Sequence, residues 1–199
     1  MKRNKHAVII VFIVWALIVG LGWALLSHYE NVPGQSQPLP EHWPLATKVR
    51  RTPGLPTLLM FVHPHCPCSR ASAGELSLIM AHSQKKVRAQ VLFLRPETLS
   101  EQWVKTDLWD SAMRIPGVEV VMDDQGKEAR IFHANVSGQV MLYDARGNLV
   151  FSGGITPSRG HQGDNDGRDA IVSFLTKGII LHKQTPFFGC LLFSSLQQS

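Results

Sequence analysis

The stretch Phe61–Arg70, which reads FVHPHCPCSR, places Cys66 and Cys68 where an apolar segment gives way to a polar one. Residues 57–63 (TLLMFVH) form a short apolar run bounded by prolines, as expected for a buried strand. Residues 69–82 carry apolar side chains at helical spacing, which predicts an amphipathic helix. Both cysteines therefore lie between a strand and a helix start, where unpaired backbone N–H groups favour a thiolate. We expect both sulfur atoms to face solvent there.

The chain beyond this junction alternates apolar runs with amphipathic turns. We expect further strands at residues 87–94, 118–122, 139–143 and 149–151, the last two joined as an antiparallel hairpin across residues 144–148. Helical segments are expected at residues 126–133 and 168–177, with amphipathic turns around Trp103, Leu108, Trp109 and Met113. This order predicts an α/β fold with a mixed central sheet and helices on both faces.

Two helix starts carry polar residues that are typical of caps. Ser72 and Glu75 have the spacing of a capping box near the start of the first helix of the domain. Asp166 is the expected N-cap of the last helix.

Residues 7–26 read AVIIVFIVWALIVGLGWALL and contain no charge. A helix of this length reaches about 30 Å, enough to cross a bilayer. We predict an uncleaved anchor rather than a signal peptide, because the run exceeds the usual apolar core of about 7–15 residues and lacks a good cleavage site. Lys2, Arg3 and Lys5 precede it and Ser27 to Ala46 contain no Lys or Arg, so residues 1–6 are expected in the cytoplasm and the rest outside it.

Three segments follow the expected anchor. Residues 27–56 hold six of the twelve prolines and are interpreted as a stalk, because proline favours extended, semi-rigid backbone. Residues 57–177 form the expected functional domain. Residues 178–199 form a C-terminal extension that contains Cys190 among apolar residues able to dock on the domain. In an oxidising compartment the odd number of cysteines leaves Cys190 as a resolving or pairing thiol, or as a buried free thiol.

Composition and charge exclude several classes of protein. The chain has 199 residues, 44% of them hydrophobic, and only three cysteines, which excludes a disordered chain and a disulfide-dense miniprotein. The net charge is +5, and the three basic residues before the apolar run supply more than half of it. The remaining excess is too small to indicate a nucleic-acid partner.

The junction around Cys66 resembles that of the thioredoxin-like superfamily, and the likeness extends over residues 57–177. It implies a three-layer thioredoxin-like fold with Cys66 as the nucleophilic cysteine. The usual second cysteine position holds Ser69, and the second thiol lies one residue earlier at Cys68. Ser137 and Gly138 stand where the superfamily usually has a cis-proline.

Three longer motifs are similar to the membrane-anchored RedB-type proteins of bacteria. They are HPHCPCSRAS at residues 63–72, GGITPSRGHQGDNDGR at 153–168 and TPFFGC at 185–190. The resemblance implies an inner-membrane protein with one membrane-spanning helix and its domain in the periplasm.

The favoured function is thiol–disulfide oxidoreduction, in which Cys66 attacks a disulfide and Cys68 or Cys190 resolves the mixed disulfide. The glycine-rich loop at residues 152–168 is expected over the cysteines, with Arg70, His161 and Arg168 as candidate supporting residues. The expected partners are protein thiols or disulfides, a membrane or periplasmic electron donor, and the lipid around residues 7–26. We assign no cofactor.

Two other functions fit the same residues. His63, His65, Cys66 and Cys68 lie within six residues and offer imidazole and thiolate ligands, which suit copper or another soft metal in a binding protein or metallochaperone. The weaker alternative is a thioredoxin fold kept as a non-catalytic interaction module. A peroxiredoxin site is excluded, because neither Cys66 nor Cys68 has the required Thr or Ser three residues before it.

Overall fold

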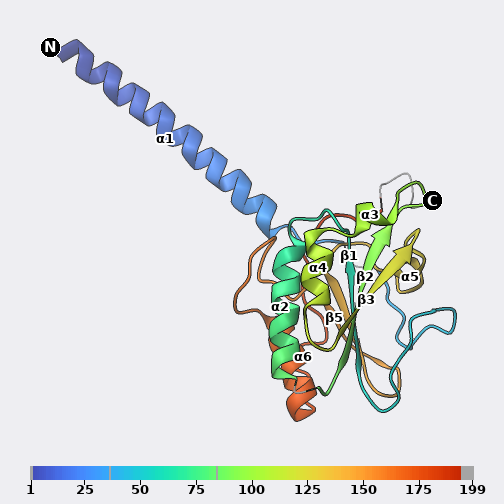
Figure 1. The fold of residues 1–199 in the computed structure, drawn as a ribbon. Helices are drawn as coiled ribbons and strands as arrows, with labels where there is room; N and C mark the ends of the chain where they lie inside the picture. The colour runs from blue at the N-terminus through green and yellow to red at the C-terminus, as the bar shows by residue number, and fades with distance from the viewer. Residues whose placement is uncertain (1, 36, 84, 194–199) are drawn as a thin grey trace. The chain divides into compact units, whose positions relative to one another are not determined.

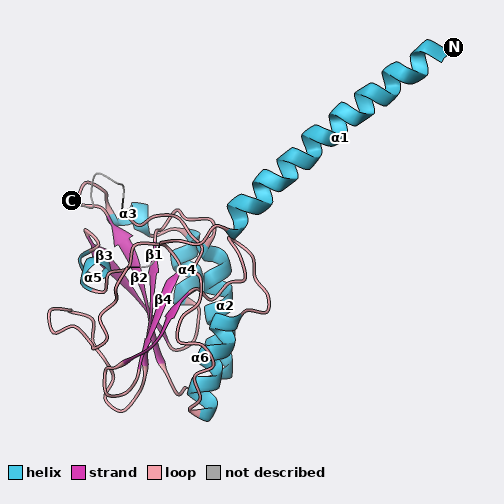
Figure 2. Ribbon diagram, turned by 180° about the vertical axis from the view of Figure 1, so that it is seen from behind, coloured by secondary structure: helices cyan, strands magenta, loops and turns pink. Residues whose placement is uncertain are grey.

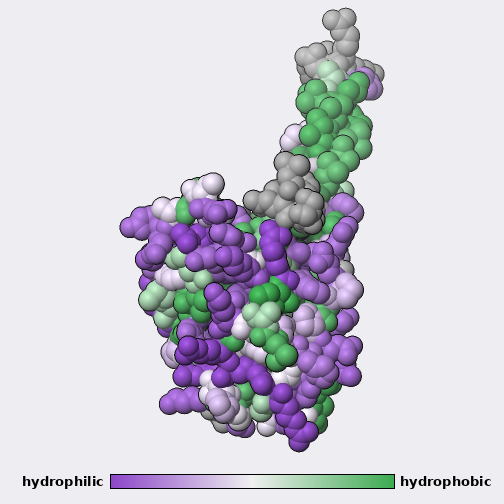
Figure 3. Space-filling view, turned by 90° about the vertical axis from the view of Figure 1, so that its right-hand side faces the viewer, coloured by the Kyte–Doolittle hydropathy of each residue, from purple (hydrophilic) through white to green (hydrophobic). Residues whose placement is uncertain are grey.

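The computed structural model describes residues 2–35, 37–83 and 85–193, and the chain divides into two compact units, residues 1–32 and 33–199. The first unit contains one helix, α1 (Lys2–Asn31). Its stretch Lys5–Asn31 is long and apolar enough to cross a membrane, and none of it is buried within the protein. Figure 3 shows hydrophobic side chains along the visible face of this helix. The predicted span at residues 7–26 lies inside it.

The second unit is built on one five-stranded mixed sheet. Its order is β3-β2-β1-β4-β5, with β1 parallel to β2, β2 parallel to β3, and the hairpin β4–β5 antiparallel to β1. This confirms the predicted mixed sheet and its terminal hairpin. The strands are β1 (Thr57–Val62), β2 (Arg88–Arg95), β3 (Val118–Asp124), β4 (Gln139–Tyr143) and β5 (Leu149–Gly153).

Helices cover both faces of the sheet, as Figures 1 and 2 show. Alternate residues of β1 explain why: Leu58 and Met60 pack into one apolar cluster with α2, α4 and α6, whereas Leu59 and Phe61 pack into a second cluster that includes α5. All residues of β1 are buried, as expected for a central strand. The helices are α2 (Ser69–His82), α3 (Glu101–Val104), α4 (Asp107–Met113), α5 (Lys127–Ile131) and α6 (Asp166–Lys177).

Both expected caps differ in the structure. Helix α2 begins at Ser69, so Ser72 and Glu75 lie inside the helix and form no capping box. The carboxylate of Glu75 is instead committed to the loop before α6. Helix α6 is capped by Asn165, whose side-chain oxygen accepts from the Arg168 N–H at 2.8 Å, so the cap lies one residue before Asp166.

The proline-rich segment 33–56 packs against the sheet instead of extending away from it as a stalk. Its Trp43 ring meets Phe132 and Tyr143 edge-on, and the Tyr143 hydroxyl donates to the Pro40 carbonyl at 2.9 Å. The C-terminal extension also docks, with Phe187, Leu192 and Phe193 buried. Proline favours extended backbone, but the apolar side chains of Leu39, Trp43 and Val49 are stabilised by packing on the domain.

Candidate functional site

The loop between β1 and α2 brings two cysteines to the start of the helix, as predicted. The Cys66 N–H donates to the His63 carbonyl at 3.0 Å, and the Cys66 carbonyl accepts from the Ser69 N–H at 3.2 Å, so the chain turns directly from strand into helix. Cys68 is the residue before the first helical residue. The backbone N–H groups of the first turn of α2 are therefore directed toward the cysteines.

Cys190 joins this pair from the far end of the chain. The sulfur atoms of Cys66, Cys68 and Cys190 all lie within 4.8 Å of one another, and all three thiols are free. The sequence singled out these three cysteines without indicating that they meet at one point. Three thiols this close permit disulfide exchange between any two of them after a small rearrangement.

Hydrogen bonds make Cys66 the most acidic of the three thiols. Burial alone would raise the pKa of Cys66, but hydrogen bonds from the Ser69 side chain and from the backbone and thiol of Cys190 outweigh it and lower the pKa to about 7. About half of the Cys66 thiols are therefore thiolate at neutral pH. This is the group prepared to act as a nucleophile.

The other two thiols hold their protons more tightly. Burial and the neighbouring charge of Cys66 raise the pKa of Cys68, while the guanidinium of Arg159 opposes that rise. Burial, the hydrogen bond given to Cys66 and the charge of Cys66 raise the pKa of Cys190 to about 12. Cys190 is thus a protonated donor to the Cys66 thiolate.

Cys66 is covered, which differs from the expected solvent-facing sulfur. Cys66 is only 2% exposed, whereas Cys68 and Cys190 are partly exposed. The cover comes from the C-terminal segment, whose Cys190 hydrogen-bonds to Cys66. Beside the thiols a cavity of about 730 Å³ is lined by residues that include His63, Trp103 and Leu191.

Two serines connect the cysteine loop to the start of β4. The hydroxyls of Ser69 and Ser137 are hydrogen-bonded at 2.7 Å, and the Ser137 hydroxyl accepts from the His63 N–H at 2.7 Å. The Gly138 N–H donates to the Phe61 carbonyl at 2.7 Å. Ser137 and Gly138 therefore stand beside the site, and in the described part of the chain no peptide bond is cis.

The two histidines before Cys66 turn toward an aromatic ring rather than toward the thiols. His63 and His65 both pack on Trp103, and the His65 Nε2 lies 2.9 Å from the Trp103 carbonyl oxygen. Neither belongs to the cluster of close sulfur ligands. Burial and the neighbouring His65 lower the pKa of His63. The candidate metal ligands are therefore the three cysteines, a different set from the one expected.

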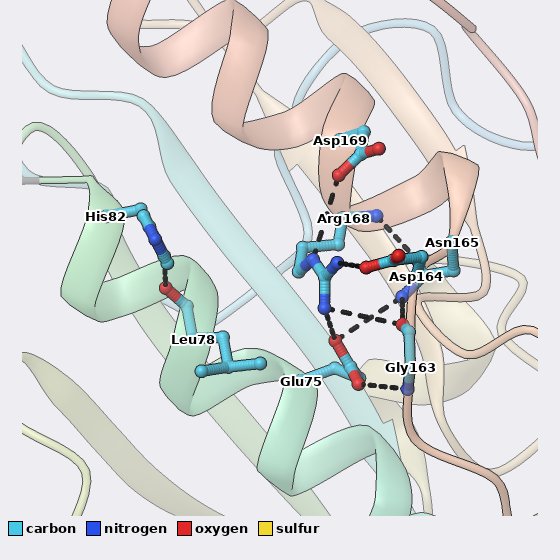
Figure 4. A network of polar contacts seen from close by, with 8 residues as sticks. All are labelled: Glu75, Leu78, His82, Gly163, Asp164, Asn165, Arg168 and Asp169. Atoms are coloured by element: carbon cyan, nitrogen blue, oxygen red, sulfur yellow. Dashed lines mark hydrogen bonds and ion pairs between the residues drawn. The ribbon is translucent and has the colours of Figure 1, made fainter.

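The three charged residues expected to support the thiols are engaged elsewhere. Arg70 forms an exposed ion pair with Asp107. The Nδ1 of His161 lies 2.9 Å from the Arg159 carbonyl oxygen and 3.1 Å from the Ser158 hydroxyl. Figure 4 shows the Arg168 guanidinium between the carboxylates of Glu75 and Asp164, with distances of 2.7 and 2.9 Å.

The basic residue that does approach the thiols is Arg159. It hydrogen-bonds to Cys68, and its charge opposes the rise in the pKa of Cys68 and of Cys190. Its Nη1 also donates to the Gly189 carbonyl at 2.6 Å. The glycine-rich loop thus does reach the cysteines, as expected, but through Arg159. No sequence pattern identifies Arg159 among the charged residues of the loop. Its contacts with Cys68 and Gly189 join segments that are far apart in the sequence.

Comparison with known proteins supports the fold. No protein-family model and no curated protein matches the sequence. A hypothetical protein from Sinorhizobium meliloti is 17% identical with a TM-score of 0.61, over 83% of this chain and 100% of its own. An uncharacterised conserved protein from Geobacillus kaustophilus is 18% identical with a TM-score of 0.56, over 83% and 95%.

A secreted Mycobacterium tuberculosis disulfide oxidoreductase is also similar, with 16% identity and a TM-score of 0.41 over 62% of this chain and 81% of its own. The fold of residues 33–193 is thioredoxin-like, as its sheet order and the placement of its helices indicate. The likeness to RedB-type proteins stays a prediction from sequence motifs.

Proposed function

We propose that this protein is a thiol–disulfide oxidoreductase with Cys66 as its nucleophile. The observation that carries the proposal is a cysteine whose pKa is lowered to about 7 at the start of α2, with two further thiols whose sulfur atoms lie within 4.8 Å. A lowered pKa supplies the attacking thiolate at neutral pH, and a close second thiol supplies the resolving group.

The exchange proceeds in two balanced steps. The Cys66 thiolate attacks one sulfur of a substrate disulfide, which forms a mixed disulfide and releases the other substrate sulfur as a thiolate that takes up a proton. Cys68 or Cys190 then loses its proton and attacks the Cys66 sulfur, which releases the second substrate thiol. The substrate gains two electrons and the protein is left with one disulfide. An electron donor of the dithiol class must reduce that disulfide before the next turnover.

We propose that α1 anchors this domain in the bacterial inner membrane with the cysteines in the periplasm. The length and apolar character of Lys5–Asn31 support an anchor, and the basic residues at its N-terminal side support a cytoplasmic N-terminus. The substrates are then periplasmic proteins with cysteines, and the electron donor is a periplasmic or membrane dithiol.

Insulin reduction by the full-length protein in detergent, with dithiothreitol as the electron donor, tests the nucleophile. We expect Cys66→Ser to lower the rate to that of dithiothreitol alone, because serine does not form an exchangeable thiolate. Ser77→Ala, at an exposed position of the same helix, is the matched control and should keep the wild-type rate. Equal rates for wild type and Cys66→Ser would reject the proposal.

A soft-metal site is the second candidate, because three close sulfur atoms are a suitable ligand set for Cu(I). Cys66, Cys68 and Cys190 would hold the ion as thiolates. Full-length protein purified without oxygen and given Cu(I) should then retain about one copper per chain, and Cys68→Ser should lose it, as measured by elemental analysis. Retention by Cys68→Ser equal to that of wild type would contradict this ligand set.

A further inference from the structure

The segment that carries Cys190 lies against the chain just before β4 as an added strand would. The Ser137 N–H donates to the Cys190 carbonyl at 2.8 Å, and the Leu192 N–H donates to the Asn135 carbonyl at 2.9 Å. Val136 and Leu191 form an antiparallel bridge between these hydrogen bonds. Residues 135–137 therefore present a backbone edge that accepts an extended peptide in a defined register.

That register brings a cysteine of the added strand to the nucleophile. With its carbonyl paired to Ser137, Cys190 directs both its backbone N–H and its thiol to Cys66. A cysteine in an extended peptide of another protein, bound at the same edge in the same way, would meet Cys66 in the same position. The chain's own segment thus occupies the place where such a peptide would bind.

The same segment keeps other proteins from the nucleophile. Cys66 is 2% exposed beneath it, whereas the Leu191 side chain above is 57% exposed. Phe187 is buried on one side of the segment, and Leu192 and Phe193 are buried on the other. Opening of residues 189–192 breaks the hydrogen bonds of Cys190 to Ser137 and of Gly189 to Arg159. It also breaks the Leu192 N–H bond to Asn135 and uncovers the buried Leu192 side chain.

We propose that residues 189–192 act as an internal substrate mimic, which occupies the edge of residues 135–137 beside Cys66 until a cysteine-containing segment of a partner protein displaces it. This inference rests on the proposed function. The segment leaves when substrate binds, Cys66 forms the mixed disulfide, and the returning segment displaces the substrate peptide. Cys190 then loses its proton and attacks the Cys66 sulfur. A Cys66–Cys190 disulfide forms, and the second substrate thiol leaves reduced.

Gly189 offers a way to move the segment without changing any thiol. A Cβ at this position would lie 1.9 Å from the Ser137 carbonyl oxygen, so alanine cannot be accommodated unless the segment shifts. Leu181→Ala is the matched control, because it changes an exposed side chain of the C-terminal extension outside residues 189–192. Phe187→Ala loosens the segment from its other side and provides a second variant that tests the same effect.

Two measurements on the full-length protein in detergent test the inference. At a pH high enough to ionise Cys66 in every variant, iodoacetamide should alkylate Cys66 about tenfold faster in Gly189→Ala than in wild type. Phe187→Ala should change the rate in the same direction, and Leu181→Ala should alkylate like wild type. After one equivalent of oxidised glutathione, peptide mapping should find a Cys66–Cys190 disulfide in wild type. In Gly189→Ala that disulfide should be replaced largely by Cys66–Cys68.

The outcomes separate this inference from the proposed function. If wild type forms only Cys66–Cys68 and all variants alkylate at the wild-type rate, the internal substrate mimic is rejected while disulfide exchange stands. If oxidised glutathione oxidises Cys66 in none of the proteins, the proposed function itself is rejected.

A synthetic peptide of residues 186–193 should form a mixed disulfide with Cys66 faster in Gly189→Ala than in wild type, and equal rates would also overturn the inference.

Discussion

At the scale of single residues, the acidity of Cys66 depends on a hydroxyl group. Ser69 donates to Cys66 and lowers its pKa against the effect of burial. A hydrogen bond to a charged group contributes about 1.5–3 kcal/mol, which corresponds to at least about one pKa unit. We therefore expect Ser69→Ala to raise the pKa of Cys66 from about 7 to about 8 and to lower its thiolate fraction at pH 7 to about a tenth.

The pH dependence of Cys66 alkylation by iodoacetamide measures this pKa. The rate follows the thiolate, so it rises with pH around a midpoint equal to the pKa, and Ser69→Ala should move that midpoint upward. Ser77→Ala, also in α2 but exposed, should leave the midpoint unchanged. A midpoint that stays at the wild-type value in Ser69→Ala would show that the hydrogen bonds from Cys190 alone keep the pKa of Cys66 at about 7.

The sequence placed both cysteines of the loop at the helix start but did not predict what surrounds them. Cys66 and Cys68 could be placed at the helix start because a strand pattern and a helix pattern meet there. The burial of Cys66 and its hydrogen bonds from Cys190 could not be predicted, since sequence separation gives no distance between segments far apart in the chain. Arg159 was missed for the same reason.

At the scale of elements, an ion pair with a buried carboxylate joins α2 to α6. Glu75 is 1% exposed and Arg168 16%, and Glu75 also accepts from the Gly163 N–H at 2.9 Å. Removing one partner of a buried pair costs about 3–5 kcal/mol because the remaining charge is left uncompensated. We expect Glu75→Gln to lower the free energy of unfolding by about 3 kcal/mol, as measured by urea denaturation.

Asp164 provides the matched comparison on the same guanidinium. Its carboxylate lies 2.9 Å from Arg168 but is fully exposed, so water screens the pair. Asp164→Asn should leave the urea midpoint nearly unchanged. Equal destabilisation by the two variants would mean that burial of Glu75 contributes little. Glu75 also fixes Gly163 in the loop that contains Arg159. Glu75→Gln should therefore also weaken the hydrogen bond from Arg159 to the Gly189 carbonyl.

The sequence predicted the elements in which apolar residues recur at a regular spacing. It did not predict the arrangements that depend on contacts between distant segments. Strand β1 and helix α2 follow from apolar spacing, and the hairpin β4–β5 from its short connection. The packing of residues 33–56 was missed because proline content describes backbone stiffness and not what Trp43 can reach. Glu75 had the spacing of a cap, but its partners Gly163 and Arg168 lie far along the chain.

At the scale of the whole molecule, one chain combines an apolar helix with a domain that carries a closed thiol site. Because residues 189–192 cover Cys66, we expect its reactivity to depend on local opening rather than on unfolding of the domain. Residues 7–26 contain no charge, and a periplasmic location would supply the oxidising surroundings in which an exchange site is used.

We predict the membrane orientation from the charges on either side of the apolar run in α1. Basic residues stay on the cytoplasmic side, and Lys2, Arg3 and Lys5 all lie before the apolar run while Ser27 to Ala46 contain no Lys or Arg. We expect alkaline phosphatase fused after Ser199 to be active in a bacterial host, because this enzyme needs periplasmic disulfides. The fusion should remain in the membrane pellet after alkaline carbonate extraction and should keep its N-terminal residues, since α1 is expected to stay uncleaved.

Replacing all three basic residues with glutamate should lower phosphatase activity per fusion molecule, because the charge difference across the span is then lost. Activity unchanged by that replacement would assign the orientation to something other than these charges, and a fusion beginning after α1 would identify a cleaved signal peptide.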